Sequence, residues 1–235
     1  MEKYKILVWG AGNRAKTILT MLKSSQGQFE YKNKVIKNYE IICLVNSSKK
    51  KNISNSIPLI YNKNKFFKIL KKVNSFIVTV GGENGYARIK ISDTLKKFKL
   101  KPISFCSKDF IKDSSVKIGS GYQIMKNVTI NSNCKIGNYC ILNTSATVDH
   151  DCFIEDGTHI MPGSTLAGDI KIGKFSTIGT NSTIIPKVKI GTNVYVGAGA
   201  VILKNIKKDQ IIVGNPQRIL RNNTKKNEFK LFSKL

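Results

Sequence analysis

The chain is poor in histidine, tryptophan and acidic residues. Its 235 residues include two histidines, one tryptophan and 14 Asp and Glu against 40 Lys and Arg, a formal net charge of +26 at pH 7. No apolar run is long enough to span a bilayer, and the opening stretch MEKYKILVWGAG lacks the apolar segment of a secretory signal. We therefore expect a cytoplasmic protein with no membrane partner.

Cysteine is present without the spacing of a metal site. The five cysteines, Cys43, Cys106, Cys134, Cys140 and Cys152, contain no C-x-x-C pair, so a zinc site is not expected. Nothing indicates secretion, so disulfides are not expected either.

The excess of lysine has three readings. The lysines are spread through the whole chain, accompanied by asparagines, and do not gather in one stripe of sequence interleaved with aromatic residues. We interpret them first as a solvated basic surface and second as an attraction for anionic substrates. Nucleic acid ranks third, and we expect no such partner.

A period of six runs through the second half of the chain. Every sixth residue from Ile118 is aliphatic, fifteen times in succession. These marked positions are Ile118, Ile124, Ile130, Ile136, Leu142, Val148, Ile154, Ile160, Leu166, Ile172, Ile178, Ile184, Ile190, Val196 and Ile202. The residue two before each mark is usually small or β-branched, and glycine often follows the mark. Alternating inward positions followed by a turn residue predict a short strand and a corner, which is typical of a parallel β-helix.

This segment resembles the hexapeptide-repeat acyltransferases. The resemblance implies a left-handed triangular prism with three hexads, or eighteen residues, per coil, so that the fifteen hexads make about five coils. We expect this β-helix domain to span residues 106–220. Cys134, Cys140 and Cys152 share one phase of the repeat and are interpreted as small core residues.

Residues 1–105 have a different pattern. YKILVWGAGNRAKTILTMLKSS and NSFIVTVGGENGYARIKISDTLKKF each read as a strand, a glycine turn and a helix, and YEIICLVNSS reads as another buried strand. Alternating strands and helices predict a Rossmann-like parallel α/β domain. The stretch from Gly10 to Ala15 fits G-x-G-x-x-A, which favours a phosphate at a helix N-terminus. The second strand ends without a carboxylate, so we expect a nucleotide-like ligand other than NAD.

The order of the two domains narrows the resemblance. A small Rossmann-like domain before a prism that contains NTSATVDHD is similar to the sialic-acid O-acetyltransferase and bacillosamine N-acetyltransferase group. This resemblance implies that the first domain holds a nucleotide-activated sugar and that the prism binds acetyl-CoA. The chain departs from the group at Asn13–Arg14, in the missing acidic pair after the second strand, and in a long stretch from Gly27 to Tyr39. Residues 221–235 are read as a basic C-terminal tail.

The eighteen-residue coil predicts which residues lie above one another. Gly168 follows His150 by eighteen residues, and Pro162, Thr180 and Ala198 form a second column. His150 and His159 differ by nine, half a coil, so within one prism they point in different directions. If both serve one reaction they come from neighbouring chains, in agreement with the homotrimer that the resemblance implies.

The resemblance also implies roles for individual residues. His150 matches the general base, for which an imidazole is suited at neutral pH, and Asp151 matches the acidic neighbour that raises its proton affinity, with Asp149 as an alternative. Gly168 matches an amide donor for the developing oxyanion, His159 a contact to the acetyl end of the donor, and Thr180 and Ala198 backbone positions along the coenzyme groove. The matched acceptor-side residues are Gly12, Asn13, Arg14 and Gly81. Asn143, one hexad before the DHD run, is a candidate to contact the substrate or to support a residue that does. For Arg14 a surface position capping the helix is the competing interpretation.

Three functions are weighed. The first is an acetyl-CoA-dependent N-acetyltransferase acting on a nucleotide-linked amino sugar for surface glycan synthesis, by direct attack with no acyl-enzyme. The second is O-acetylation of a sialic-acid-like or other sugar hydroxyl. The third is a non-catalytic β-helix scaffold or nucleic-acid binder, which predicts no affinity for acetyl-CoA.

Overall fold

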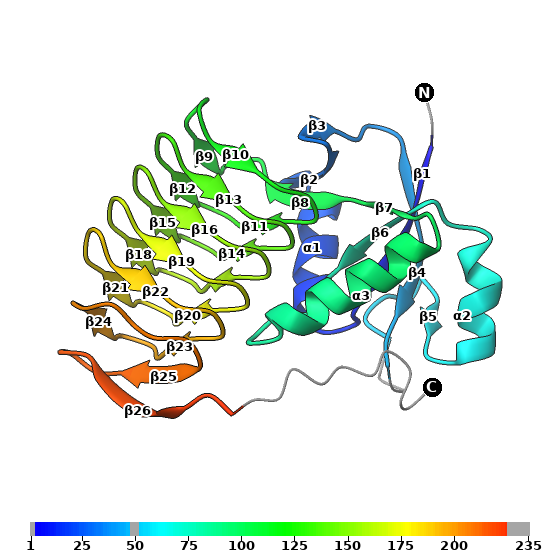
Figure 1. Ribbon diagram of the computed structural model, residues 1–235. Coiled ribbons are helices and arrows are strands. Elements are labelled where there is room, and N and C mark those ends of the chain that lie inside the picture. Colours follow the sequence, from blue (N-terminus) through cyan, green and yellow to red (C-terminus); the bar gives the residue numbers. More distant parts are fainter. Residues whose placement is uncertain (1–2, 48–51, 225–235) are drawn as a thin grey trace.

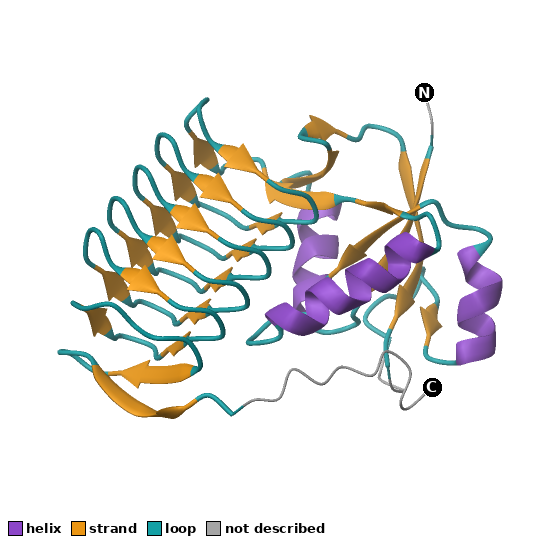
Figure 2. Cartoon of the chain, in the orientation of Figure 1, coloured by secondary structure: helices purple, strands orange, loops and turns teal. Residues whose placement is uncertain are grey.

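The computed structural model describes residues 3–47 and 52–224. Figure 1 shows an N-terminal α/β domain packed against the side of a long β-helix. Figure 2 shows that the helices belong to the N-terminal domain, whereas the second half is built from short strands and turns. The Rossmann-like domain and the left-handed β-helix predicted from the sequence are both confirmed.

The N-terminal domain is a doubly wound parallel sheet. Its five strands have the order β5-β4-β1-β6-β7, and all neighbouring pairs are parallel. The elements are β1 (Tyr4–Trp9), α1 (Asn13–Lys23), β4 (Tyr39–Val45), β5 (Leu59–Ile60), α2 (Lys63–Leu70), β6 (Ser75–Val78), α3 (Gly85–Lys97) and β7 (Lys101–Pro102). The strand order reverses between β1 and β6, which is where a sheet of this kind opens a crevice for ligands.

The β-helix follows the period of six without interruption. Each of its fifteen two-residue strands ends on a marked aliphatic residue, and every mark except the partly buried Ile118 is buried. The strands are β10 (Lys117–Ile118), β11 (Gln123–Ile124), β12 (Thr129–Ile130), β13 (Lys135–Ile136), β14 (Ile141–Leu142), β15 (Thr147–Val148), β16 (Phe153–Ile154), β17 (His159–Ile160), β18 (Thr165–Leu166), β19 (Lys171–Ile172), β20 (Thr177–Ile178), β21 (Thr183–Ile184), β22 (Lys189–Ile190), β23 (Tyr195–Val196) and β24 (Val201–Ile202).

Strands eighteen residues apart pair in parallel and build three sheets. The lysine sheet has the order β10-β13-β16-β19-β22, and the threonine sheet has the order β24-β21-β18-β15-β12-β9, where β9 is Ile111–Lys112. The domain-facing sheet has the order β26-β25-β23-β20-β17-β14-β11-β8-β2-β3, in which the outer strands are β26 (Arg218–Asn222), β25 (Gln210–Val213), β8 (Ser104–Ser107), β2 (Gly27–Tyr31) and β3 (Lys34–Val35). The marked side chains of all three sheets meet in one core, together with Cys106, Cys134, Cys140 and Cys152. The cysteines of the repeat are therefore buried core residues.

The corners depend on a residue other than the glycine expected from the sequence. The residue three positions after each mark except the last has a left-handed backbone, at every sixth position from Gly121 to Gly199. Most of these residues are not glycine, and Asn and Asp are frequent because they tolerate this conformation. The glycine directly after a mark allows close stacking instead: a Cβ on Gly137 would lie 2.7 Å from the amide nitrogen of Asp156 in the next coil.

The β-helix is longer than the marks indicate. Before the first mark, β8 (Ser104–Ser107) and β9 (Ile111–Lys112) pair with β11 and β12. After the last mark, β25 (Gln210–Val213) pairs with β23, and β26 (Arg218–Asn222) pairs antiparallel with β25. The predicted boundary at 105/106 falls within β8, and the predicted tail from 221 begins inside β26; residues 225–235 lie outside the described part.

The long stretch from Gly27 to Tyr39 joins the two domains. It contains the hairpin of β2 (Gly27–Tyr31) and β3 (Lys34–Val35), and β2 pairs antiparallel with β8. The N-terminal domain thus adds two strands to the domain-facing sheet of the prism. The side chains of Glu30 on β2 and Tyr122 in the prism are hydrogen-bonded across this junction.

Candidate active site

His150 and Asp151 lie at the corner between the threonine and lysine sheets. The Nδ1 of His150 is 2.8 Å from a carboxylate oxygen of Asp151. A carboxylate only accepts hydrogen bonds, so Nδ1 carries the proton and Nε2 of the neutral ring is free to accept one. The hydrogen bond to Asp151 is the largest of the effects that raise the pKa of His150 above its ordinary value, and the same bond lowers the pKa of Asp151.

Asp149, the alternative partner of the base, has a different role. Its carboxylate accepts hydrogen bonds from the backbone amide of His150 at 2.9 Å and from the side-chain amide of Asn131 at 2.7 Å. Asp151 reaches the imidazole because its backbone is left-handed, with φ at 59°. The chain is therefore not extended at this corner, and side chains adjacent in sequence do not alternate between opposite faces.

Gly168 lies one coil from His150, as the spacing of eighteen predicts. The amide of Asp169 donates to the carbonyl of His150 at 2.9 Å, and a Cβ on Gly168 would lie 2.5 Å from both Cε1 and Nε2 of the imidazole. Gly168 is buried, and its amide nitrogen donates to no other residue of the described part. The N–H group of Gly168 is therefore available to a ligand, and the imidazole of His150 packs directly against this residue.

His159 lies on the domain-facing sheet and is 3% exposed. Its Nδ1 is 3.1 Å from the carbonyl oxygen of Gly82, which requires a proton on Nδ1, and its Nε2 is 3.4 Å from the side-chain nitrogen of Asn143. Burial, with smaller effects from Arg88 and Arg14, lowers the pKa of His159 to about 3. This imidazole is therefore neutral, and its Nε2 accepts hydrogen bonds.

The four acceptor-side residues of the N-terminal domain line one cavity. Gly12, Asn13, Arg14 and Gly81 surround a space of about 520 Å³ at the carboxyl ends of β1 and β6, together with Asn46 and Ser47 after β4. Both α1 and α3 begin at this cavity, and neither has a side-chain cap or an acidic residue in its first turn. Unsatisfied N–H groups at two helix N-termini favour an anionic group.

Arg14 lines this cavity. Its Nε is buried and has no hydrogen-bond partner in the described part of the chain, and it would lie 3.1 Å from a Cβ on Gly81. Burial lowers the pKa of Arg14 to about 10, so the guanidinium remains charged at neutral pH. An anionic ligand in the cavity could accept a hydrogen bond from this unused donor and balance the charge of the guanidinium.

Thr180 and Ala198 form the predicted second column with Pro162. The amide of Asn181 donates to the carbonyl of Pro162, and the amide of Gly199 to that of Thr180, at 3.0 and 2.8 Å. This column lies at the corner between the domain-facing and threonine sheets, where Asn143 also lies. His150 is at another corner, so a single prism does not bring the base together with the acceptor-side residues.

Arg88 is a site-forming residue that the sequence analysis missed. It is 1% exposed and donates to the carbonyl oxygens of Tyr139 and Gly157 in the prism and of Val80 beside the cavity, at 3.1, 2.6 and 3.1 Å. Burial lowers the pKa of Arg88 to about 9. It holds α3 and the loop after β6 against the prism. The only sequence signal was a basic residue on the otherwise apolar side of a predicted helix.

No helix of the described residues combines the length and apolar character needed to cross a bilayer. No three His, Cys, Asp or Glu side chains of the described part gather in a way that would hold a metal ion.

The comparisons with known proteins agree with this architecture. The model of the bacterial transferase hexapeptide family (six repeats) matches residues 115–150, 151–185 and 169–204. A search of the curated proteins found no match.

Solved structures match both domains together. The acetyltransferase domain of PglB from Neisseria gonorrhoeae FA1090, in complex with acetyl coenzyme A, is 27% identical with a TM-score of 0.78, covering 93% of this chain and 100% of that chain. WeeI from Acinetobacter baumannii AYE is 25% identical with a TM-score of 0.77 and the same coverage. A variant of perosamine N-acetyltransferase from Caulobacter crescentus, in complex with CoA and GDP-perosamine, shares the fold at 22% identity, with a TM-score of 0.80 over 93% of this chain and 97% of that chain.

The repeat family covers the prism, and the structural likeness covers the N-terminal domain as well. The repeats of residues 115–204 therefore match the bacterial transferase hexapeptide family, and the chain as a whole is similar to acetyltransferases that join such a prism to an N-terminal α/β domain.

Proposed function

We propose that this enzyme transfers the acetyl group of acetyl-CoA to the amine of a nucleotide-linked amino sugar used in glycan synthesis. The observation that carries the proposal is the juxtaposition of His150, paired with Asp151, and the uncommitted amide of Gly168. A base beside an oxyanion donor is what direct acyl transfer requires. The acetyltransferase domain of PglB, 27% identical to this chain, was crystallised with acetyl coenzyme A, which supports the same donor here.

His150 is suited to remove the proton of the attacking amine. Its Nδ1–H is held by Asp151, so Nε2 is directed away from that carboxylate as an acceptor. When the amine attacks the thioester carbonyl, Nε2 takes the proton, and the resulting imidazolium is stabilised by Asp151. The cleaved C–S bond releases coenzyme A as thiolate, which regains a proton from the imidazolium, so the base returns to its starting state.

Gly168 is suited to stabilise the charge on the thioester oxygen. A thioester held at this corner develops negative charge on its carbonyl oxygen during attack, and a fixed N–H offsets that charge. The absence of a side chain lets the imidazole of His150 lie directly against Gly168, because a Cβ there would be 2.5 Å from Nε2.

The cavity at the α1 and α3 N-termini is suited to the diphosphate of a nucleotide sugar. Backbone N–H groups and Arg14 supply positive potential, and Gly12 and Asn13 form the turn itself. The sugar would then extend toward His159 and Asn143, which lie where the cavity loop meets the prism. The perosamine enzyme, crystallised with CoA and GDP-perosamine, has the same arrangement of domains.

A homotrimer brings the two halves of the site together. The domain-facing sheet is covered by the N-terminal domain, and the lysine sheet would repel a second copy. The threonine sheet carries uncharged outward residues, Thr129, Thr147, Thr165, Thr183 and Val201. If three such sheets face a common axis, the corner of Thr180 and Ala198 in one chain lies opposite the corner of His150 and Gly168 in the next. Acetyl-CoA would occupy that groove, with His159 near its acetyl end.

Complementation between two inactive variants tests this arrangement. His150→Ala removes the base and Arg14→Glu removes the acceptor site, and each alone should be inactive. In mixed trimers formed by co-expression, random assembly restores about a quarter of the interfaces, so coenzyme A release should reach that fraction of the wild-type rate. Mixed trimers with no activity would show that base and acceptor site act within one chain.

O-acetylation of a sugar hydroxyl is the second candidate. Asn46 and Ser47, rather than a carboxylate, follow β4 at the cavity, so the acidic contact to a nucleotide ribose is missing. The same base and amide would serve a hydroxyl acceptor. Coenzyme A release measured with amino-sugar nucleotides, their hydroxyl analogues and free sialic acids separates the two: turnover only with hydroxyl acceptors would replace the amine proposal.

A further inference from the structure

The residue before each marked position points out of the prism, five times on each sheet. On the domain-facing sheet these residues are Gln123, Ile141, His159, Thr177 and Tyr195. On the threonine sheet they are Thr129, Thr147, Thr165, Thr183 and Val201. On the lysine sheet they are Lys117, Lys135, Phe153, Lys171 and Lys189, the lysine ladder.

The composition of the chain does not account for the lysine ladder. All four lysines among the fifteen outward positions lie on one sheet, and the other two sheets have none. A lysine-rich sequence without a constraint on position would place some of them on each sheet. The lysines of this face are exposed, as a solvated basic surface requires, but the coil gathers residues that are spread in the sequence into one row that includes Phe153.

The ladder is unfavourable for the isolated chain. Lys117 is in register with Lys135, and Lys171 with Lys189, on strands about 4.8 Å apart. Like charges directly opposite each other on neighbouring strands destabilise a sheet. Among the residues with described positions, no carboxylate forms an ion pair with any of these four ammonium groups. An anionic ligand would supply the missing counter-charge.

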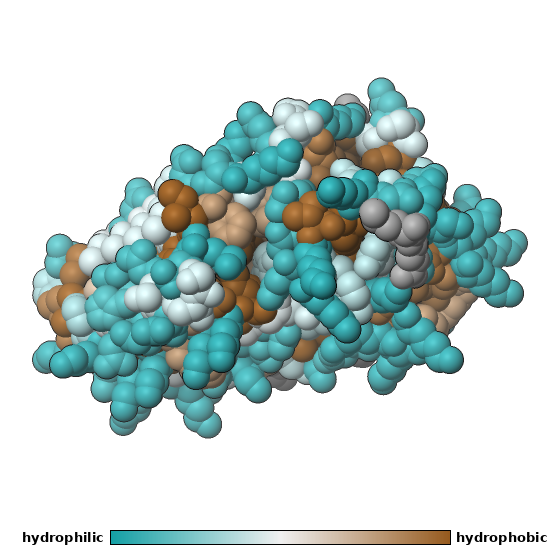
Figure 3. All heavy atoms as spheres, turned by 90° about the horizontal axis from the view of Figure 1, so that it is seen from above, coloured by the Kyte–Doolittle hydropathy of each residue, from teal (hydrophilic) through white to brown (hydrophobic). Residues whose placement is uncertain are grey.

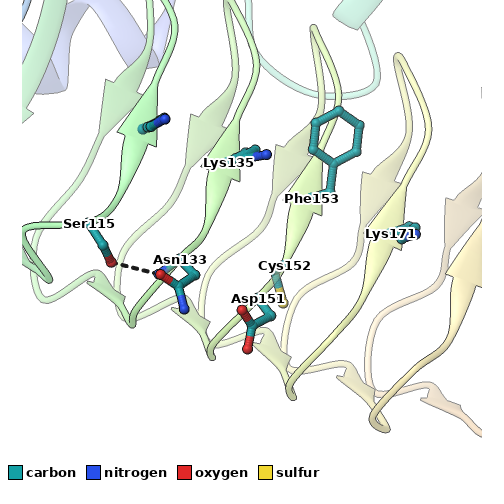
Figure 4. Close-up of a pocket in the computed structure, with 8 residues that line it drawn as sticks. Ser115, Asn133, Lys135, Asp151, Cys152, Phe153 and Lys171 are labelled. Carbon is teal, nitrogen blue, oxygen red and sulfur yellow. Dashed lines mark hydrogen bonds between the residues drawn. The ribbon is translucent and has the colours of Figure 1, made fainter.

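Phe153 interrupts the ladder and borders two grooves. Its side chain is 43% exposed. One groove of about 660 Å³ passes Lys117, Lys135 and Lys171 and has Asp151 at its corner edge. Another groove of about 440 Å³ also borders Phe153, and its lining includes Lys117, Lys135 and Lys174 together with Glu155 and Asp156. Figure 4 shows Lys135, Phe153 and Lys171 in one row on successive coils, with Ser115, Asn133 and Asp151 in a parallel row at the corner.

We propose that the lysine ladder binds a linear anionic polysaccharide, with acidic groups at the lysines and a sugar ring on the face of Phe153. A chain-like ligand fits the grooves on both sides of Phe153, and its repeated charges match a repeated cation. The four lysines and Phe153 are not among the residues of the proposed acetyl transfer, so their replacement tests this binding separately, although Asp151 of that site borders the larger groove.

Two other polyanions fit less well. A bilayer surface would favour several exposed apolar residues, and Phe153 is the one large apolar side chain of the described lysine sheet that is strongly exposed. The face seen from above in Figure 3 is mainly hydrophilic, with separate apolar patches. Single-stranded nucleic acid favours a series of aromatic platforms for successive bases, whereas the ladder has one.

Fluorescence anisotropy with labelled polysialic acid tests the proposal on the full-length protein. The variant Lys135→Glu/Lys171→Glu should bind at least about tenfold more weakly than the wild type, because two cations become anions beside the ligand. Phe153→Ala, with no change in charge, should weaken binding by about threefold or more through the lost stacking. Lys65→Glu/Lys68→Glu on α2 is the matched control, since it changes the net charge equally at exposed positions, and it should change binding less than twofold.

Comparison ligands decide the class of partner. Neutral dextran should not bind, and oligothymidylate and phosphatidylserine vesicles should bind more weakly than polysialic acid. Equal weakening by the ladder and control variants, stronger binding of the oligonucleotide or the vesicles, or no polysaccharide binding would each overturn the proposal. Circular dichroism and coenzyme A release verify that the variants are folded. Loss of polysaccharide binding alone leaves the acetyl-transfer proposal intact, and failure of acetyl transfer with binding retained leaves the ladder intact.

Discussion

Replacing Gly168 by alanine should displace the catalytic base without disturbing the fold. The backbone of Gly168 is not left-handed, so alanine can adopt it, and the added methyl group would lie 2.5 Å from Cε1 and Nε2 of His150. Carbon atoms in normal contact are about 3.5–4.0 Å apart. The imidazole must therefore move by about 1 Å, away from the amide that Gly168 presents.

The size of the effect follows from that displacement. A misplacement of about 1 Å at a reacting group costs on the order of 10²-fold in rate, or about 2.7 kcal/mol in transition-state stabilisation. We expect kcat to fall by this factor, since alanine retains the backbone N–H. The KM for acetyl-CoA should change much less. Continuous detection of free coenzyme A thiol measures both parameters.

A double-mutant cycle shows whether the loss depends on His150. In a His150→Ala background there is no ring for the methyl group to meet, so Gly168→Ala should cause almost no further loss. Contacting residues are expected to be strongly non-additive in this way. Wild-type kcat in Gly168→Ala would refute the stacking of Gly168 on the base. A full loss retained in the His150→Ala background would mean that the methyl group obstructs a substrate instead.

Three further perturbations test other parts of the site. Asp151→Asn removes the hydrogen-bond partner that raises the pKa of His150. Because the base is active when deprotonated, kcat/KM rises with pH through that pKa. The acidic limb of the pH profile should therefore move to lower pH in the variant, and the maximal rate should fall. Arg14→Met should raise the KM for a nucleotide sugar by about tenfold or more, because a charge-assisted contact is lost. The KM for acetyl-CoA should not change. An unchanged KM for the nucleotide sugar would mean that its diphosphate binds elsewhere. Arg88→Met leaves the buried carbonyls of Tyr139, Gly157 and Val80 without their donor. It should lower the free energy of unfolding, measured by urea denaturation, by about 3 kcal/mol or more. Lys90→Met, on the exposed side of the same helix, is the control and should change the free energy of unfolding by less than about 0.5 kcal/mol.

The repeat was predictable because one physical requirement recurs at each sixth residue. Each mark must be apolar to fill a narrow prism, and each corner must accept a left-handed residue, so fifteen strands could be read directly. The strand β9 was missed because Lys112 occupies a marked position at the open end of the prism, where burial is not required. The hairpin β2–β3 was noticed only as extra length, since its partner β8 is more than 70 residues away.

The sequence predicted which site residues stack on one another within the prism, but it did not predict the contacts between the prism and the N-terminal domain. The spacing of eighteen placed Gly168 beside His150, because parallel pairing fixes which residues stack. It gave no information on the burial of His159 under Gly82 or on the contacts of Arg88, which depend on how the α/β domain docks. Asp151 and Asp149 were indistinguishable in sequence because the left-handed backbone at Asp151 decides which carboxylate reaches the ring.

The fold therefore depends on a sequence period of six residues, and the site depends on a period of eighteen. The core requires only that the pattern return after six residues, whereas each contact of the site requires a return after eighteen. Inserting one whole hexad between His150 and Gly168 would keep every mark inside the prism and every corner in place. It would also turn all later coils by one sheet, so that the glycine would lie at a different corner from the base and the lysine ladder would divide between two sheets. The prism tolerates such a change, but the proposed chemistry does not. For this reason the interior residues indicate the type of fold, whereas the outward residues and the corner residues determine the properties of the site.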